Sequence, residues 1–287
     1  MKHILLVPNT QKDKELAVTK QVAAYIADRA KLFLHEDYRG FGVEVAGFRA
    51  PDEVYSGIDC IIVLGGDGTL LGVAREAASH KIPILGINLG RLGFLAEVER
   101  HEIEACLDKL LAGAYTVENR MMIHAVIRKA SGSTAAFDAL NDIVIARTSF
   151  SRLLDLNVYV NDEFVDDYKA DGIIIATPTG STAYSMSAGG PIVDPSVNTF
   201  LITPICPHKM YSRTIIVPES KSISVVVNDK HTKNAMVTAD GQEGTRFELG
   251  DRLEITKSVN STGLIRVSGS RFYSVLRHKL AGKESSQ

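Results

Sequence analysis

The stretch that decides the fold is Ile61-Ile62-Val63-Leu64-Gly65-Gly66-Asp67-Gly68-Thr69-Leu70-Leu71. An apolar run of strand length ends in glycines and passes directly into a pattern compatible with a helix. Open α/β sheets bind their ligands at such strand ends. Glycines let a phosphate approach the backbone closely, and the N–H groups that begin the next helix attract anions. The stretch therefore predicts a parallel α/β sheet with a phosphate-binding turn at its edge.

This turn matches neither of the two common nucleotide-binding fingerprints. The chain contains no G-x-x-x-x-G-K-[ST] loop, and the spacing after Gly66 and Gly68 fails the G-x-G-x-x-G pattern. Asp67 is unusual in an anion-binding turn, because its carboxylate repels the ligand unless it binds a metal or takes a proton. The alternative is a turn aspartate that hydrogen-bonds its own backbone.

The residues around the turn alternate between strand and helix patterns. Apolar runs at 4–7, 58–64 and 83–88 predict strands, and helical spacing at 16–30, 70–78 and 102–112 predicts helices, the last ending at Gly113. This alternation predicts an α/β domain with a parallel, Rossmann-like sheet over residues 1–118.

After Tyr115 the pattern changes to a succession of strands. The expected strands are 122–127, 142–146, 154–160, 172–176, 222–227 and 252–255, with hairpin turns at Asn161-Asp162, Asn228-Asp229 and Ser131-Gly132-Ser133. We therefore expect a mostly β domain over residues 119–267. The last segment, about 268–287, contains a short helix at 272–280 that is expected to pack on the first domain.

Composition narrows the class of protein. The chain has 287 residues, is 45% hydrophobic and 23% charged, and carries a formal net charge of -2. These values predict two globular domains and argue against nucleic acid as the main partner. No apolar run approaches the roughly 20 residues of a membrane span, and the run before Pro8 is too short for a signal peptide. Cys60, Cys106 and Cys206 show no C-x-x-C spacing. We expect a cytoplasmic protein that binds neither membrane nor nucleic acid.

Two segments carry a resemblance to a known family. Gly65-Gly66-Asp67-Gly68-Thr69 resembles the GGDGT signature of NAD kinases, diacylglycerol-type lipid kinases and, more distantly, phosphofructokinases. Asp171-Gly172-Ile173-Ile174-Ile175-Ala176-Thr177-Pro178-Thr179-Gly180-Ser181-Thr182-Ala183-Tyr184-Ser185 is similar to the long glycine-rich motif of NAD kinases, as is 188–192 after it. Three further segments, 88–95, 140–142 and 238–242, resemble motifs of the same family and occur in the same order. Over residues 61–244 the chain is identified as a member of the NAD kinase family.

The resemblance implies a reaction and a set of residues. NAD kinases transfer the terminal phosphoryl group of ATP, or in some members polyphosphate, to the 2′-hydroxyl of the adenosine ribose of NAD, with a divalent cation, Mg²⁺ or Mn²⁺. Phosphoryl transfer requires a group that accepts the hydroxyl proton, and Asp67 is our candidate for this general base. The resemblance further implies a homo-oligomer, dimer or tetramer, with sites shared between subunits. The implied NAD-binding residues are Asp67, Gly68, Phe94, Asn141, Asp142, Asp171, Thr182, Ala183, Tyr184 and Ser187, and the implied donor-binding residues are Gly65, Gly66, Gly68, Thr69 and Arg91.

One departure from the family pattern is visible at Asn141-Asp142, where the family most often has Asn-Glu. The carboxylate is kept, but its reach is one methylene shorter. Two alternatives to an NAD kinase stay open. A lipid or sphingoid-base kinase shares the Gly65 to Thr69 turn but not the second motif, and a non-catalytic nucleotide sensor leaves Asp67 without a role.

Overall fold

The computed structural model describes residues 2–96, 98–148, 152–228, 235–242, 244–269 and 272–281. The chain divides into two compact units, Met1–Asn119 with Thr262–Gln287, and Arg120–Ser261. The first boundary lies one residue after the expected 118, and the second lies six residues before the expected 267. Both fall inside long strands, β7 (Thr116–Arg128) and β18 (Arg252–Arg266), which is why no linker composition marks them.

The first unit is built on a parallel sheet with the strand order β3-β2-β1-β4-β5, and β6 pairs with β5. The end of β18 adds to this sheet where Leu264 lies opposite Ile84 of β5. The strand order reverses between β1 and β4, and ligands of such sheets bind at the carboxyl ends of the strands at this switch point. The strands are β1 (His3–Pro8), β2 (Lys31–His35), β3 (Gly47–Arg49), β4 (Cys60–Gly65), β5 (Ile84–Asn88) and β6 (Val98–Glu99).

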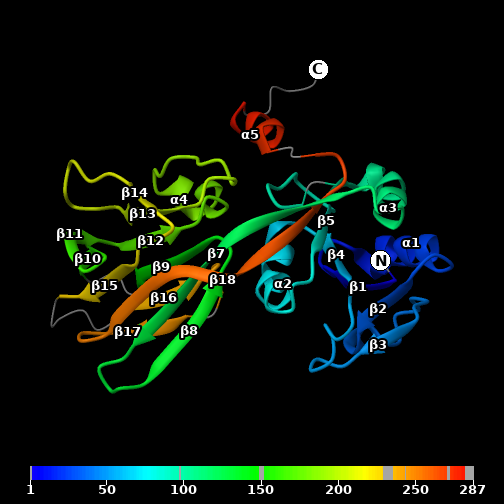
Figure 1. Cartoon of the computed structure of the whole chain (residues 1–287), viewed down its shortest axis with the longest axis horizontal. Coiled ribbons are helices and arrows are strands. Elements are labelled where there is room, and N and C mark those ends of the chain that lie inside the picture. Colours follow the sequence, from blue (N-terminus) through cyan, green and yellow to red (C-terminus); the bar gives the residue numbers. More distant parts are fainter. Residues whose placement is uncertain are drawn as a thin grey trace. The chain divides into compact units, whose positions relative to one another are not determined.

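Helices cover both faces of this sheet (Figure 1). Helices α1 (Ala17–Ile26) and α3 (Ile103–Leu111) share one core with alternate residues of the strands, such as Ile4 and Ile62. Helix α2 (Asp67–Ser79) covers the other face, where its Leu70 lies over Gly86 of β5. The helix α5 (Phe272–Leu280) has the bounds that the sequence predicts, and the short 3₁₀ helices are η1 (Lys14–Leu16), η2 (Glu36–Tyr38) and η3 (Arg100–Glu102).

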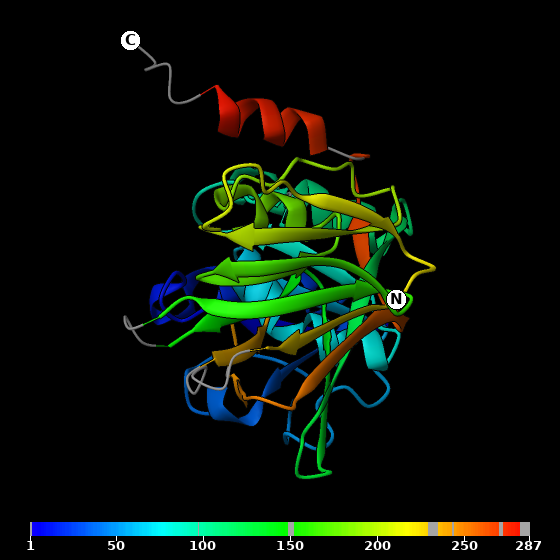
Figure 2. The same cartoon turned by 90° about the vertical axis from the view of Figure 1, so that its left-hand side faces the viewer.

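The second unit contains two packed layers of antiparallel strands (Figure 2). One layer has the order β14-β13-β12-β9-β16-β17, and the other contains β11, β10, β15 and β18 with β7 and β8. Ile143 and Ile173 of the first layer share a core with Leu156 and Val225 of the second. The strands are β8 (Thr134–Ala139), β9 (Asp142–Arg147), β10 (Leu154–Val160), β11 (Glu163–Ala170), β12 (Gly172–Ala176), β13 (Thr199–Ile205), β14 (Ile215–Pro218), β15 (Ile223–Val227), β16 (Ala235–Ala239) and β17 (Thr245–Phe247).

The local predictions can be compared with this structure. The turn at Asn161-Asp162 is confirmed, because both residues have positive φ, 49° and 63°, between the antiparallel strands β10 and β11. Of the predicted turn at Asn228-Asp229, Asp229 lies outside the described residues. The expected fold class, a parallel α/β domain with a mostly β domain, is confirmed.

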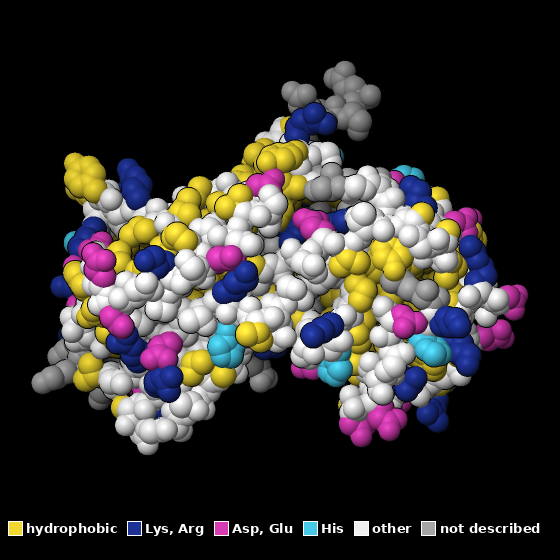
Figure 3. Space-filling model, in the orientation of Figure 1, with side chains coloured by type: hydrophobic (Ala, Val, Ile, Leu, Met, Phe, Trp, Pro, Cys, Tyr) yellow, Lys and Arg dark blue, Asp and Glu magenta, His cyan; other side chains and the backbone are white. Residues whose placement is uncertain are grey.

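The surface shown in Figure 3 carries basic and acidic side chains intermixed over the visible face. Among the described residues, no helix combines the length and the apolar character that crossing a bilayer requires.

Candidate functional site

Asp67 is held by the loop that follows β5. One oxygen of its carboxylate, Oδ2, accepts a hydrogen bond from the backbone N–H of Phe94 at 2.8 Å. The other, Oδ1, accepts from Leu95 N at 3.1 Å and Ala96 N at 3.2 Å. A Cβ atom at Gly93 would lie 1.9 Å from Oδ1, so only glycine allows this approach. The half-buried carboxylate therefore sits at the start of α2 and fixes the 93–96 turn.

The 93–96 turn is held from two further sides within the first unit. Arg266, 6% exposed, donates from Nη1 to the Leu95 carbonyl at 3.3 Å and from Nε to Glu118 at 2.7 Å. The ring of Phe94 contacts α5, with the Phe272 ring centre 5.9 Å away and Lys279 Nζ 5.0 Å from the Phe94 centroid. Phe94 is thus half-buried against α5, on the same turn that holds Asp67.

The carboxyl ends of β1, β4 and β5 are tied together around the glycine turn. Asn9 donates from its backbone N to the Leu64 carbonyl and from Nδ2 to Thr69 Oγ1, each at 2.8 Å. Leu89 N donates to the Gly65 carbonyl at 2.8 Å. Lys12 extends over this turn, since a Cβ atom at Gly66 would lie 2.5 Å from its Nζ. Three strand ends therefore form one small edge site in the first unit.

Asp240 holds a turn of the second unit through three backbone hydrogen bonds, as Asp67 does in the first unit. Its carboxylate accepts hydrogen bonds from the backbone N of Leu140 at 2.9 Å, Asn141 at 2.7 Å and Asp142 at 3.2 Å. The turn is also held by Thr177, whose Oγ1 donates to the Leu140 carbonyl at 2.6 Å. The side-chain amide of Asn141 has no hydrogen-bond partner within the described parts of the chain and is half-buried. It is therefore available to a ligand.

Asp142 is only 5% exposed. Burial and, after it, the neighbouring charge of Asp240 raise the pKa of the Asp142 carboxyl to about 7. A carboxyl of this kind titrates near neutral pH, so its charge depends on conditions under which most aspartates stay ionised.

The glycine-rich motif separates its side chains into a buried and an accessible set. Ser181 is buried and donates to the Pro178 carbonyl at 2.6 Å, and buried Ser185 lies 3.0 Å from Thr203 Oγ1. The N-cap residues of the two short helices in this segment are Thr179 and Ala183, so neither Ser181 nor Thr182 caps a helix. This segment contains the short helices η4 (Gly180–Thr182) and α4 (Tyr184–Ser187). The resemblance implies four NAD-binding residues here, and all four are half-buried or exposed: Thr182, Ala183, Tyr184 and Ser187.

Asp171 lies at the start of β12 with its carboxylate 2.7 Å from Nε of Arg147. Its side chain is 31% exposed. Asp171 is therefore paired with the guanidinium of Arg147 and still partly accessible to a ligand.

The structure brings most of the expected residues together within each unit, but Asp171 lies at the opposite end of β12 from Asp142 and the 177–187 segment. The first unit groups Gly65, Gly66, Asp67, Gly68 and Thr69 with Phe94, and Arg91 is exposed on the same loop. The second groups Asn141 and Asp142 with the 177–187 segment, where a Cβ atom at Gly180 would lie 2.1 Å from the Asn141 carbonyl oxygen. The sequence analysis did not identify three basic residues near these groups: Lys12, Arg147 and Arg120. Arg120 is buried and donates a hydrogen bond to Thr179 Oγ1 at 3.3 Å. No local pattern marks them, because their contacts come from distant segments.

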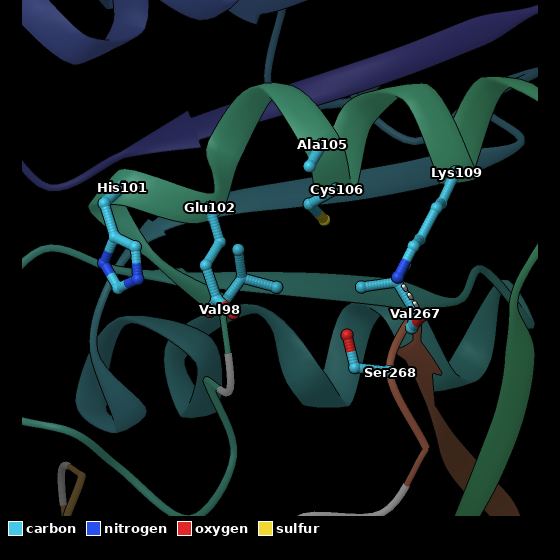
Figure 4. Close-up of a pocket in the computed structure, with 8 residues that line it drawn as sticks. All are labelled: Val98, His101, Glu102, Ala105, Cys106, Lys109, Val267 and Ser268. Atoms are coloured by element: carbon cyan, nitrogen blue, oxygen red, sulfur yellow. Dashed lines mark hydrogen bonds between the residues drawn. The ribbon is translucent and has the colours of Figure 1, made fainter.

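A hollow of about 200 Å³ in the first unit lies away from these residues (Figure 4). His101 and Lys109 lie at its two ends, and Lys109 donates to the Val267 carbonyl at 3.3 Å. None of its lining residues belongs to the expected site: Val98, His101, Glu102, Ala105, Cys106, Lys109, Val267 and Ser268.

Comparison with known proteins agrees with this architecture. Residues 4–115 match the family model of the ATP-NAD kinase N-terminal domain, and residues 140–267 match that of the ATP-NAD kinase C-terminal domain. An NAD kinase of Thermoanaerobacter sp. (strain X514) is 48% identical over 98% of this chain and 99% of its own length. An NAD kinase of Caldanaerobacter subterraneus subsp. tengcongensis is 47% identical over the same shares.

Two solved structures are similar along most of the chain. An NAD kinase from Archaeoglobus fulgidus in complex with ATP superposes with a TM-score of 0.74 at 25% identity, covering 96% of this chain and 98% of its own. A yeast NADH kinase complexed with NADH has a TM-score of 0.87 at 22% identity and covers 100% of this chain and 89% of its own. This similarity shows a shared fold. The family models, the relatives and the two groups of motif residues agree, and the chain belongs to the NAD kinase family of enzymes.

Proposed function

We propose that the enzyme transfers the terminal phosphoryl group of ATP, or of polyphosphate, to the 2′-hydroxyl of the adenosine ribose of NAD, and that Asp67 accepts the hydroxyl proton. The observation that carries this proposal is the fixed position of the Asp67 carboxylate. It lies beside the glycine turn at the edge of the parallel sheet, where three backbone N–H groups orient it.

The hydrogen bonds of Asp67 leave room for this role. A carboxylate has about four lone-pair sites, and the 93–96 turn occupies three of them. The remaining site is free to accept a hydroxyl. In a loose phosphoryl-transfer transition state the attacking hydroxyl becomes acidic late, so a well-placed carboxylate suffices as the base.

Adenosine and ribose recognition is proposed for Asn141, Asp142, Asp171 and the accessible face of the 182–187 segment. The unpartnered amide of Asn141 supports this, as does the separation of accessible from buried hydroxyls in the motif. The ATP complex of the Archaeoglobus relative supports ATP as the donor. Arg91 and the Gly65–Thr69 turn are the proposed donor contacts in this chain.

A divalent cation, Mg²⁺ or Mn²⁺, is proposed to arrive with the donor. The described residues contain no group of three His, Cys, Asp or Glu that could hold a metal. Mg²⁺ is commonly bound by one or two carboxylates together with substrate phosphates, so a dedicated cage is not required. When bound, the cation neutralises charge on the phosphate oxygens. We also propose a cytoplasmic homo-oligomer.

The direct test incubates purified protein with NAD, Mg²⁺ and either ATP or polyphosphate. NADP is detected with an NADP-specific dehydrogenase, and ³¹P NMR of the product identifies the phosphorylated hydroxyl. We expect NADP carrying a 2′-phosphate. Failure to form NADP with both donors, or phosphorylation at another hydroxyl, would falsify the proposal. A lipid kinase or a non-catalytic sensor forms no NADP in this assay.

A further inference from the structure

Lys12 lies at the switch point of the parallel sheet, in the segment that follows β1. We propose that its ammonium group binds the oligophosphate chain of the phosphoryl donor across the backbone of Gly66 and Gly90. This inference deepens the proposed function and rests on it for the reaction, although the binding of phosphate by Lys12 can be measured separately.

The position of Nζ is defined by two glycines. A Cβ atom at Gly66 would lie 2.5 Å from Lys12 Nζ, and one at Gly90 would lie 3.5 Å from it. Lys12 is exposed, and its ammonium lies over the turns that follow β4 and β5, where it is accessible to a ligand. A Cβ atom at position 66 would require the Lys12 ammonium to move.

The backbone that carries Lys12 is firmly held. Asn9 Oδ1 accepts hydrogen bonds from the backbone N of Gln11 at 3.0 Å and of Lys12 at 3.2 Å. The Asn9 carbonyl accepts another from Lys12 N at 3.0 Å. Asn9 is itself bonded to Leu64 and Thr69 of the glycine-turn region. The start of the lysine side chain is thus fixed relative to the glycine turn.

The charge of Lys12 is not neutralised by the acids nearest in sequence or in the turn. The adjacent Asp13 is 2% exposed, and its carboxylate accepts hydrogen bonds from the backbone N of Val18 and Thr19 and from Thr19 Oγ1. Asp67 is committed to the 93–96 turn. Within the described residues, Lys12 Nζ has no hydrogen bond or ion pair.

An unpaired ammonium over a glycine turn, next to the first turn of α2, is suited to an anion. Lysine binds phosphate as a compact point charge, and the backbone N–H groups at the helix start add to the attraction. The site faces the carboxyl edge of the sheet, where the donor is expected to bind. Lys12 is therefore a binding residue for the donor, and NAD is bound by other residues.

The test compares Lys12→Met with Lys14→Met, an exposed lysine two residues further along that serves as the matched control. Charge-assisted hydrogen bonds contribute enough that we expect the donor KM of Lys12→Met to rise about 10- to 100-fold. The KM for NAD and the thermal midpoint should stay at the wild-type values. Lys12→Arg, which keeps the charge, should restore most of the donor affinity.

Direct binding separates this inference from the proposed reaction. Calorimetry with Mg-ATP and with Mg-tripolyphosphate, without NAD, should show the same loss for both probes in Lys12→Met and none in Lys14→Met. Unchanged affinity for both probes, a loss confined to ATP, or a rise in KM for NAD alone would each overturn the inference. If the wild type forms no NADP while tripolyphosphate binding still depends on Lys12, the reaction is wrong and the phosphate site stands.

Discussion

Asp67 and Asp240 each accept hydrogen bonds from three successive backbone N–H groups, and each fixes a turn that carries other site residues. The sequence identified the Asp67 turn from its glycines and the preceding strand. It could not identify the donors at 94–96, which lie 27 to 29 residues along the chain and meet Asp67 only through the pairing of β4 with β5. Asp67 therefore has a structural role as well as the proposed chemical one, so its two roles must be separated by experiment.

The buried Asp142 makes stability depend on pH. Its folded-state pKa of about 7 lies above the usual value near 4, so the stability it provides is complete below about pH 4 and is lost as the pH rises through 7. Asp142→Asn removes this dependence, and the variant should gain stability relative to wild type between pH 5 and 8. The expected size is on the order of 1.4 kcal/mol for each unit of pKa shift.

Thermal midpoints of both proteins at pH 5, 6, 7 and 8 check this prediction. The difference between them should widen up to about pH 7 and then level off. A difference that stays constant over this range contradicts the assignment of the raised pKa to Asp142.

At the scale of elements, the strand and helix patterns predicted β1, β4, α2, β5 and α3 close to their observed bounds. The strand β2 (Lys31–His35) was missed, since it begins directly after the helical pattern of 16–30, which was expected to continue beyond the observed end of α1 at Ile26. In the second unit the expected strands did not include β8, β11, β13, β14, β16 and β17. Among these, β13 is the most informative. It is buried along its whole length although it contains Pro204, a residue that argues against a central strand. Tertiary packing thus overrides the local signal at both places.

The junction of α2 with the 93–96 turn yields a matched pair of glycine substitutions. Gly93→Ala places a methyl group 1.9 Å from Asp67 Oδ1, so we expect a loss of stability of about 1 to 3 kcal/mol and a lower kcat. Gly72→Ala, within α2 and with no atom within 4 Å of the added Cβ, should raise stability by up to about 1 kcal/mol and leave kcat unchanged.

Denaturant midpoints and steady-state rates of the two variants test whether the turn has room for a methyl group at position 93. Equal behaviour of Gly93→Ala and Gly72→Ala would show that the turn accommodates the methyl group and that Asp67 is not held as tightly as the hydrogen bonds indicate.

At the scale of the whole molecule, the change in pattern after Tyr115 predicted the two-domain organisation and placed the first boundary within one residue, but the second boundary was placed six residues too late. The boundaries at 119 and 261 lie inside β7 and β18, so no proline- or glycine-rich linker marks them. Family membership rests on both halves, because separate family models match residues 4–115 and 140–267.

Assembly of the whole molecule remains a prediction. Each chain has a mass of 31.2 kDa, and we expect sedimentation equilibrium to show a dimer or tetramer. Met210 and Tyr211, 84% and 83% exposed, offer apolar surface for such contacts. Specific activity should fall on dilution if sites are shared between subunits. A monomer with full activity at nanomolar concentration contradicts the shared site.

The measurement that tests the central claim most directly is single-turnover phosphorylation of NAD by Asp67→Asn, with Asp240→Asn as the control. Each substitution replaces a carboxylate that accepts three backbone hydrogen bonds with a neutral amide, but only Asp67→Asn removes the proposed base. We predict that Asp67→Asn slows the chemical step by about 10²- to 10⁴-fold while NAD still binds, and that Asp240→Asn mainly weakens NAD binding. A chemical step in Asp67→Asn as fast as in the wild type would contradict the account.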